Sequence, residues 1–71
     1  MDFKLTKEEK KLLNITRDLF DHFQTDYIDV KKILDFLNLK TLKSSVKIQN
    51  GKVFIKDIAK LIKEENIKYK I

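Results

Sequence analysis

The chain carries an Asn-Gly pair, Asn50-Gly51, in the middle of a segment whose residues alternate between apolar and polar from Ser45 to Lys56. Asn-Gly is typical of a two-residue type I′ turn, in which both residues need a positive φ, so residues 45–56 are predicted to form a β-hairpin. The apolar residues of this hairpin share one face, which must pack against helices because an isolated hairpin is only marginally stable in water. From the turn outwards, the predicted cross-strand pairs are Gln49 with Lys52, Ile48 with Val53, Lys47 with Phe54, and Val46 with Ile55.

The chain is 71 residues long, has no cysteine, and is 38% charged. A chain of this size forms one domain with a small core, here residues 1–71, and without cysteine it has neither disulfides nor thiolate metal sites. No apolar run approaches the roughly 20 residues of a membrane span, and the first five residues lack the apolar region of a signal peptide. We therefore expect a single small domain that is soluble, intracellular (in the cytoplasm, the nucleus or the nucleoid) and not bound to a membrane.

Two helices are predicted in the first half of the chain. The first begins after Thr6, because Thr6-Lys7-Glu8-Glu9 has the form of a capping box, and an apolar stripe that starts at Leu12 extends it to about Phe23. The second follows Asp29, which is a favourable N-cap residue, and ends at Asn38. Both helices have one apolar side, so both are expected to cover the hairpin.

The second half is predicted to contain a short helix over residues 39–45, then the hairpin, then a helix that has Asp57 at its N-terminal end and stops near residues 65–66. The tail, residues 67–71, alternates again and is a candidate strand, as are residues 2–5, so either terminus could pair with the edge of the hairpin. The expected fold is α+β and mainly helical, a bundle of three helices with a β-hairpin at residues 45–56.

The sequence offers little for catalysis. Its one histidine is His22, and its only serines are the adjacent Ser44 and Ser45, so a nucleophile with its own base and orienting acid has few possible sources. No glycine-rich phosphate loop is present. His22 lies at the end of the first predicted helix, where a histidine is commonly stabilised by the helix dipole. We expect no enzymatic activity, no catalytic or metal site and no cofactor.

The net charge of +5 is unevenly distributed along the chain. Residues 1–39 have a net charge of −1, whereas residues 40–71 carry nine lysines against three acidic residues. Such an asymmetry suggests a polyanionic partner for the second half, although a solvated lysine-rich surface would give the same composition.

Two regions, residues 20–33 and residues 51–58, resemble the framework of calmodulin-like EF-hands, with apolar Ile28 and Val53 at the eighth loop position. Positions one, three, five and twelve of a calcium-binding loop supply oxygen ligands. Lys32 instead places a cation where the bidentate glutamate belongs. The resemblance therefore implies a degenerate pair of loops that binds no calcium and grips a helix. The residues at positions one, three, five and twelve are Asp21, Phe23, Thr25 and Lys32 in the first loop and Val46, Ile48, Asn50 and Asp57 in the second.

A second resemblance is to winged helix-turn-helix DNA-binding domains. Residues 26–39 resemble the strand and support helix of that fold, and the Asn50-Gly51 hairpin resembles its wing. The resemblance implies that residues 40–47, rich in Lys, Thr and Ser, are the recognition element. No arginine is present there for bidentate contact with guanine, so contacts to the DNA backbone are expected to dominate.

The sequence thus favours a small regulatory nucleic-acid-binding protein, with duplex DNA as the expected nucleic acid, slightly over a protein-binding one. The alternative is an adaptor, an inhibitor or a subunit of a larger complex, anchored to its protein partner by aromatic side chains. In that alternative the anchors are Tyr27, Phe36 and Phe54. For nucleic acid, the predicted contact residues are Lys40, Thr41, Lys43, Ser44, Lys47, Asn50, Lys52 and Lys56.

Overall fold

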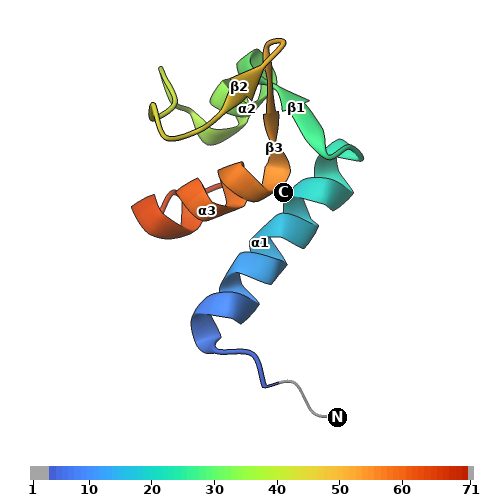
Figure 1. Cartoon of the computed structure of the whole chain (residues 1–71), viewed down its shortest axis with the longest axis vertical. Helices are drawn as coiled ribbons and strands as arrows, with labels where there is room; N and C mark the ends of the chain where they lie inside the picture. Colours follow the sequence, from blue (N-terminus) through green and yellow to red (C-terminus); the bar gives the residue numbers. More distant parts are fainter. Residues whose placement is uncertain (1–3, 71) are drawn as a thin grey trace.

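The computed structural model describes residues 4–70, and over that range the fold is α+β, as predicted (Figure 1). The described chain contains three helices and one small antiparallel sheet with the strand order β1-β3-β2. No helix in this range is long and apolar enough to cross a membrane. In chain order the elements are α1 (Lys7–Phe23), β1 (Tyr27–Asp29), α2 (Val30–Leu37), β2 (Ile48–Gln49), β3 (Lys52–Phe54) and α3 (Ile55–Glu65).

Helix α1 begins with the predicted capping box. The backbone N–H of Thr6 donates to Glu9 Oε1 at 3.0 Å, and the backbone N–H of Glu9 donates to Thr6 Oγ1 at 3.1 Å. These two bonds satisfy donors that have no partner within the first turn of a helix. The helix ends where Gln24 adopts a left-handed conformation with φ 57°.

The hairpin has the predicted turn and the predicted inner register, with Gln49 opposite Lys52 and Ile48 opposite Val53. The two outer pairs are wrong, because the second strand ends at Phe54 and α3 begins at once with Ile55. The hairpin strands therefore occupy 48–49 and 52–54 within the predicted 45–56. Of the four apolar residues predicted to share the inner face, Val46, Val53 and Ile55 are buried, but Ile48 on the edge strand is 52% exposed.

The free edge of β3 is covered by β1, a segment from between the first two helices. Ile28 lies opposite Val53 in this antiparallel pair, and both side chains are buried. Hydrogen bonds continue beyond the strands, from Ile55 N to Asp26 O at 2.8 Å and from Val30 N to Gly51 O at 2.9 Å. The prediction that a chain terminus takes this edge is wrong for residues 67–70 and for residues 4–5, which form no strand, while residues 2–3 and 71 lie outside the described residues.

Helix α2 begins after Asp29, as predicted, but the Asp29 side chain caps no N–H among the described residues. Asp29 is also the last residue of β1, opposite Lys52, so its backbone follows the strand. At the other end Asn38 adopts φ 55° and stops the helix at the expected place.

The short helix predicted for residues 39–45 does not form. Residues 39–47 are an irregular connection that closes a turn through a hydrogen bond from Val46 N to Lys43 O at 3.0 Å. Leu39 and Leu42 pack against the core and Val46 is buried in it. Thr41, Ser44 and Ser45 disfavour a helix in this segment, because their hydroxyls compete for backbone hydrogen bonds and lower its helix propensity.

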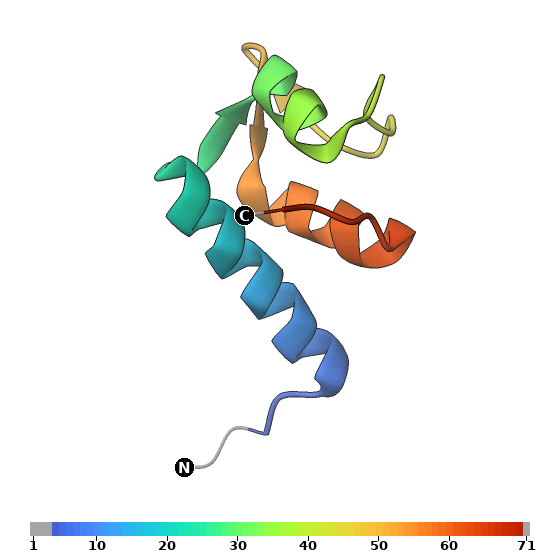
Figure 2. The same ribbon diagram turned by 180° about the vertical axis from the view of Figure 1, so that it is seen from behind.

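The core lies where α1 and α3 pack against each other and against the inner face of the sheet. Leu19, Ile33 and Ile58 are completely buried within it, one from each helix. After α3 the chain turns at Asn66, and residues 67–70 run back across the molecule towards α1 (Figure 2).

Candidate functional site

The residues predicted to contact nucleic acid do not share one element. Five of them lie on the irregular connection, Asn50 is in the turn, Lys52 is on β3, and Lys56 is in the first turn of α3 rather than on the hairpin. All eight are exposed. The five on the connection are Lys40, Thr41, Lys43, Ser44 and Lys47.

Acidic side chains lie close to this connection. Lys43 Nζ is 2.8 Å from Glu65 Oε2 at the end of α3. Asp57 and Glu64 line a hollow of about 220 Å³ together with Ser45. The surface around the connection therefore has mixed charge, which weakens its attraction for a polyanion.

The three aromatic residues predicted to anchor a protein partner are divided between two places. Tyr27 and Phe54 form a cross-strand pair with ring centroids 5.2 Å apart, and Tyr27 is 52% exposed. Their neighbours in the ladder, Ile28 and Val53, point into the core, so the two rings lie on the outer face of the sheet. Phe36 lies elsewhere, half-buried on α2.

Phe36 belongs to a cluster of aromatic rings between α1, α2 and the segment after α3. Its ring centroid lies 5.0 Å from His22, 5.1 Å from Phe23 and 6.0 Å from Tyr69. The Tyr69 hydroxyl donates to Asp18 Oδ2 at 3.1 Å. Burial raises the pKa of Tyr69, and the hydrogen bond to the Asp18 carboxylate raises this pKa further.

The His22 ring lies edge-on to the Phe23 ring, with centroids 4.8 Å apart, and is tilted against the Phe36 ring. Within residues 4–70 no group of three or more His, Cys, Asp or Glu side chains is arranged to hold a metal ion. The Thr25 hydroxyl is bonded to the backbone of Tyr27, accepting from its N–H at 3.3 Å and donating to its carbonyl at 3.2 Å. Lys32, Lys52 and Asp29 all line the small hollow of about 170 Å³ beside the first loop, so its charge is mixed.

Helix α1 has an exposed hydrophobic surface that is not predicted from the sequence. Leu13 is 48% exposed and Phe20 is 40% exposed, and because they are seven residues apart they lie on the same side of the helix. Leu5, just before the helix, is 40% exposed. The sequence signal for this surface is the pair Leu12-Leu13, in which the second leucine lies beside the core stripe rather than in it.

A groove of about 340 Å³ lies beside these leucines, between α1 and α3. We call it the α1–α3 groove. Lys56 Nζ also lies 6.0 Å from the centroid of the Phe54 ring, so the aromatic pair on the sheet adjoins one end of the groove. The residues that line the α1–α3 groove are Leu5, Glu9, Leu12, Leu13, Thr16, Lys56 and Lys60.

Two polar side chains of α1 that line the groove, Thr16 and Glu9, form hydrogen bonds with the backbone. The Thr16 hydroxyl donates to the carbonyl of Leu12 at 2.8 Å, within the helix. The Glu9 carboxylate accepts the Thr6 backbone N–H, and this hydrogen bond lowers the pKa of Glu9. The groove therefore presents apolar side chains at its floor and two lysine side chains at its α3 wall.

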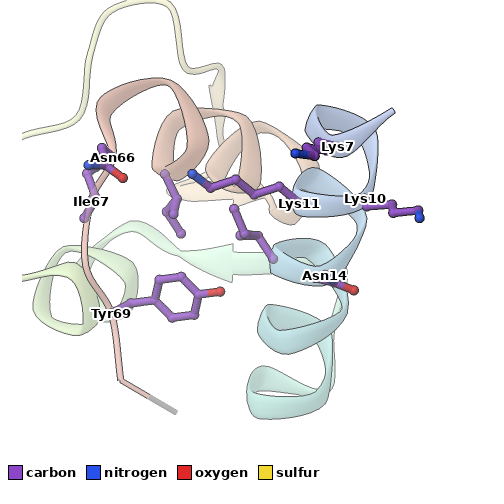
Figure 3. A pocket seen from close by; sticks show the side chains of 9 residues that line it. Lys7, Lys10, Lys11, Asn14, Asn66, Ile67 and Tyr69 are labelled. Carbon is purple, nitrogen blue, oxygen red and sulfur yellow. The ribbon is translucent and has the colours of Figure 1, made fainter. Parts of the chain in front are cut away.

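A second hollow, of about 460 Å³, lies on another side of α1 (Figure 3). Lys11 extends from α1 across this hollow, Lys10 points away from it, and the Tyr69 hydroxyl points towards α1. At the start of α1, Lys63 Nζ is 3.0 Å from Glu8 Oε2, and this interaction lowers the pKa of Glu8. This ion pair joins the start of α1 to the last turn of α3.

In comparisons with known proteins, no family model, no curated protein and no solved structure matches this chain.

Proposed function

We propose that this chain is a non-enzymatic protein-binding module, an adaptor or a subunit of a larger assembly, that holds a helix of its partner in the α1–α3 groove. The observation that carries the proposal is the row of exposed apolar side chains formed by Leu5, Leu13 and Phe20 beside a hollow of about 340 Å³. Large apolar side chains that gather in one groove typically mark an interaction site. A helical groove of this form is a common way to bind an amphipathic helix.

The resemblance to EF-hands agrees with this proposal. The residues at the eighth position of the two loops, Ile28 and Val53, are paired in the antiparallel ladder between β1 and β3. The ladder joins the α1-β1-α2 unit to the β3-α3 unit, so that α1 and α3 pack side by side. We interpret the chain as a degenerate pair of loops whose remaining use is to position these two helices.

Nucleic-acid binding is a second candidate function, and winged-helix-like recognition belongs with it. Its support is the exposure of Lys40, Lys47 and Lys52, which pair with no acidic side chain among the described residues. Against it, the connection that would be the recognition element has no helix to place in a groove of DNA. Acidic Glu65 also lies within 2.8 Å of Lys43. We therefore place protein binding first.

Selection from a displayed library of helical peptides tests the proposal without a known partner. Peptides retained by the native chain are expected to bind the Leu13→Glu variant at least about tenfold more weakly, because the new carboxylate is placed against apolar surface. The matched control is Ile48→Glu, which introduces the same charge at an equally exposed apolar residue outside the groove. Retained peptides that bind Leu13→Glu as well as they bind the native chain would refute the proposed site, provided that circular dichroism shows both variants folded.

A further inference from the structure

The charges around the α1–α3 groove have one predominant sign. Lys56 and Lys60 line its α3 wall and are four residues apart, so they lie one above the other on the same side of that helix. On α1, exposed Arg17 lies four residues after Leu13 and three before Phe20, so it borders the exposed apolar row. Positive charge therefore lies on the α3 wall of the groove and beside the apolar row on α1.

The acidic groups near the groove offset this charge only in part. Glu9 lines the groove, and its carboxylate accepts the backbone N–H of the N-cap residue Thr6 at 3.0 Å, which holds this side chain at the start of α1. Glu8, the other acid in the first turn, pairs with Lys63 on another side of the helix. Asp21 follows Phe20 at the far end, beyond the residues that line the groove. The residues that line the groove thus supply two cations, Lys56 and Lys60, against one carboxylate, Glu9, and Arg17 adds a third cation beside the apolar row.

The length of the apolar row limits the shape of the partner. Leu13 and Phe20 are about 10 Å apart along the helix axis, at 1.5 Å per residue, and the helix begins about 9 Å before Leu13, with Leu5 just beyond its end. A partner helix of about four turns would match this row, with apolar residues at a spacing of three or four.

From these observations we infer that the α1–α3 groove takes an acidic amphipathic helix, whose apolar side meets Leu5, Leu13 and Phe20 and whose carboxylates meet Lys56 and Lys60. This inference rests on the proposed function and adds the chemical class of the partner. A second copy of the chain is a poor occupant, because each copy has a net charge of +5 and none of the three helices in the described residues has an excess of acidic side chains.

Three synthetic helical peptides of about four turns test the inference by fluorescence anisotropy. They share one leucine stripe at a spacing of three and four, and their flanking residues are glutamate in the first, glutamine in the second and lysine in the third. The glutamate peptide is expected to bind about five- to tenfold more tightly than the glutamine peptide at low salt, since two exposed charge pairs together contribute a factor of about this size. This advantage should disappear between about 50 mM and about 500 mM salt. The lysine peptide should bind most weakly.

Charge reversal at the wall supplies the variant and its control. Lys56→Glu combined with Lys60→Glu should reverse the order of the glutamate and lysine peptides. The control, Lys40→Glu combined with Lys47→Glu, makes the same change in net charge on the irregular connection and should leave the order intact.

The possible results separate the two claims. If the glutamate and glutamine peptides bind equally and Leu13→Glu abolishes both, the inference fails while the proposed function stands. If the connection variant changes the order as much as the wall variant does, the preference is a net-charge effect and the inference also fails. If no peptide binds and the displayed library yields none that depends on Leu13, both claims fail. A dimer in sedimentation that Leu13→Glu dissociates would assign the groove to a second copy and overturn the inference.

Discussion

Four residues other than glycine hold a positive φ in the described chain, and three of them end helices. Asn38 and Asn66 stop α2 and α3, and asparagine tolerates this left-handed region better than other L-residues. Gln24, at φ 57° after α1, has no such tolerance, although its side-chain amide donates to the Asp21 carbonyl at 2.7 Å. The C-terminal end of α1 therefore stores a small amount of backbone strain, which the C-terminal ends of α2 and α3 largely avoid.

We expect Gln24→Gly to raise the free energy of unfolding by about 0.5–1 kcal/mol. Glycine adopts a left-handed φ without the steric cost that glutamine pays, and the relief of this cost exceeds the larger chain entropy that glycine loses on folding. Denaturation in urea measures the change. Asn38→Gly is the matched control and should have the smaller effect, since asparagine already accepts a left-handed φ. A Gln24→Gly variant that is less stable than the native chain would show that the hydrogen bond to Asp21 outweighs the strain.

At the scale of elements, residues 67–70 form neither helix nor strand, yet they bridge α1 and α2. Tyr69 contributes an aromatic ring beside Phe36 and a hydroxyl that donates to Asp18. Ile67 packs against the core. Removing residues 67–71 should lower the free energy of unfolding by about 1–2 kcal/mol, from the apolar surface of two half-buried side chains, and should increase the binding of a hydrophobic dye.

The Tyr69 hydroxyl also gives this segment a dependence on pH. The pKa of Tyr69 is raised by burial and by its bond to Asp18, so the neutral form is favoured in the folded chain. The neutral Tyr69 hydroxyl contributes fully to the free energy of unfolding below the ordinary tyrosine pKa of about 10. This contribution is lost as the pH rises through the higher pKa that Tyr69 has in the folded chain. Tyr69→Phe should therefore be less sensitive than the native chain to alkaline pH, measured as the urea midpoint between about pH 9 and about pH 11. Equal alkaline losses in both proteins would contradict this assignment.

Elements with local signals were predictable from the sequence, whereas elements that depend on distant partners were not. The capping box at Thr6 and the turn at Asn50-Gly51 act within four residues, and both form as expected. Strand β1 is only three residues long and shows no period, so a strand there is suggested only by the resemblance of residues 26–39 to winged helices, and its pairing depends on a ladder to residues 52–54. The α1–α3 groove has the same origin, because Leu13 and Lys60 become neighbours only when the two helices pack together.

At the scale of the whole molecule, the excess of lysine in residues 40–71 does not become one positive face. The acids of this half, Asp57, Glu64 and Glu65, lie on α3 beside the connection that carries Lys40, Lys43 and Lys47. Other lysines lie on α1 (Lys7, Lys10 and Lys11) and on the α3 wall of the groove (Lys56 and Lys60), so the cations are spread around the molecule. A net charge of +5 distributed in this way attracts polyanions weakly and without orientation.

We therefore expect only weak binding to a random DNA duplex of about 20 base pairs, with no saturation below about 100 µM protein at physiological salt, as for non-specific association. Because no single patch dominates, Lys43→Glu combined with Lys47→Glu should weaken this binding no more than the same double change at Lys10 and Lys31 does. Fluorescence anisotropy of the labelled duplex at two salt concentrations measures both effects. Saturation at low micromolar protein, with a slope near −4.5 in log K against log salt from five phosphate contacts and with loss confined to the Lys43 and Lys47 variant, would reverse the order of the two functions. The connection would then be the binding element, held on the core by Leu39, Leu42 and Val46 without a recognition helix.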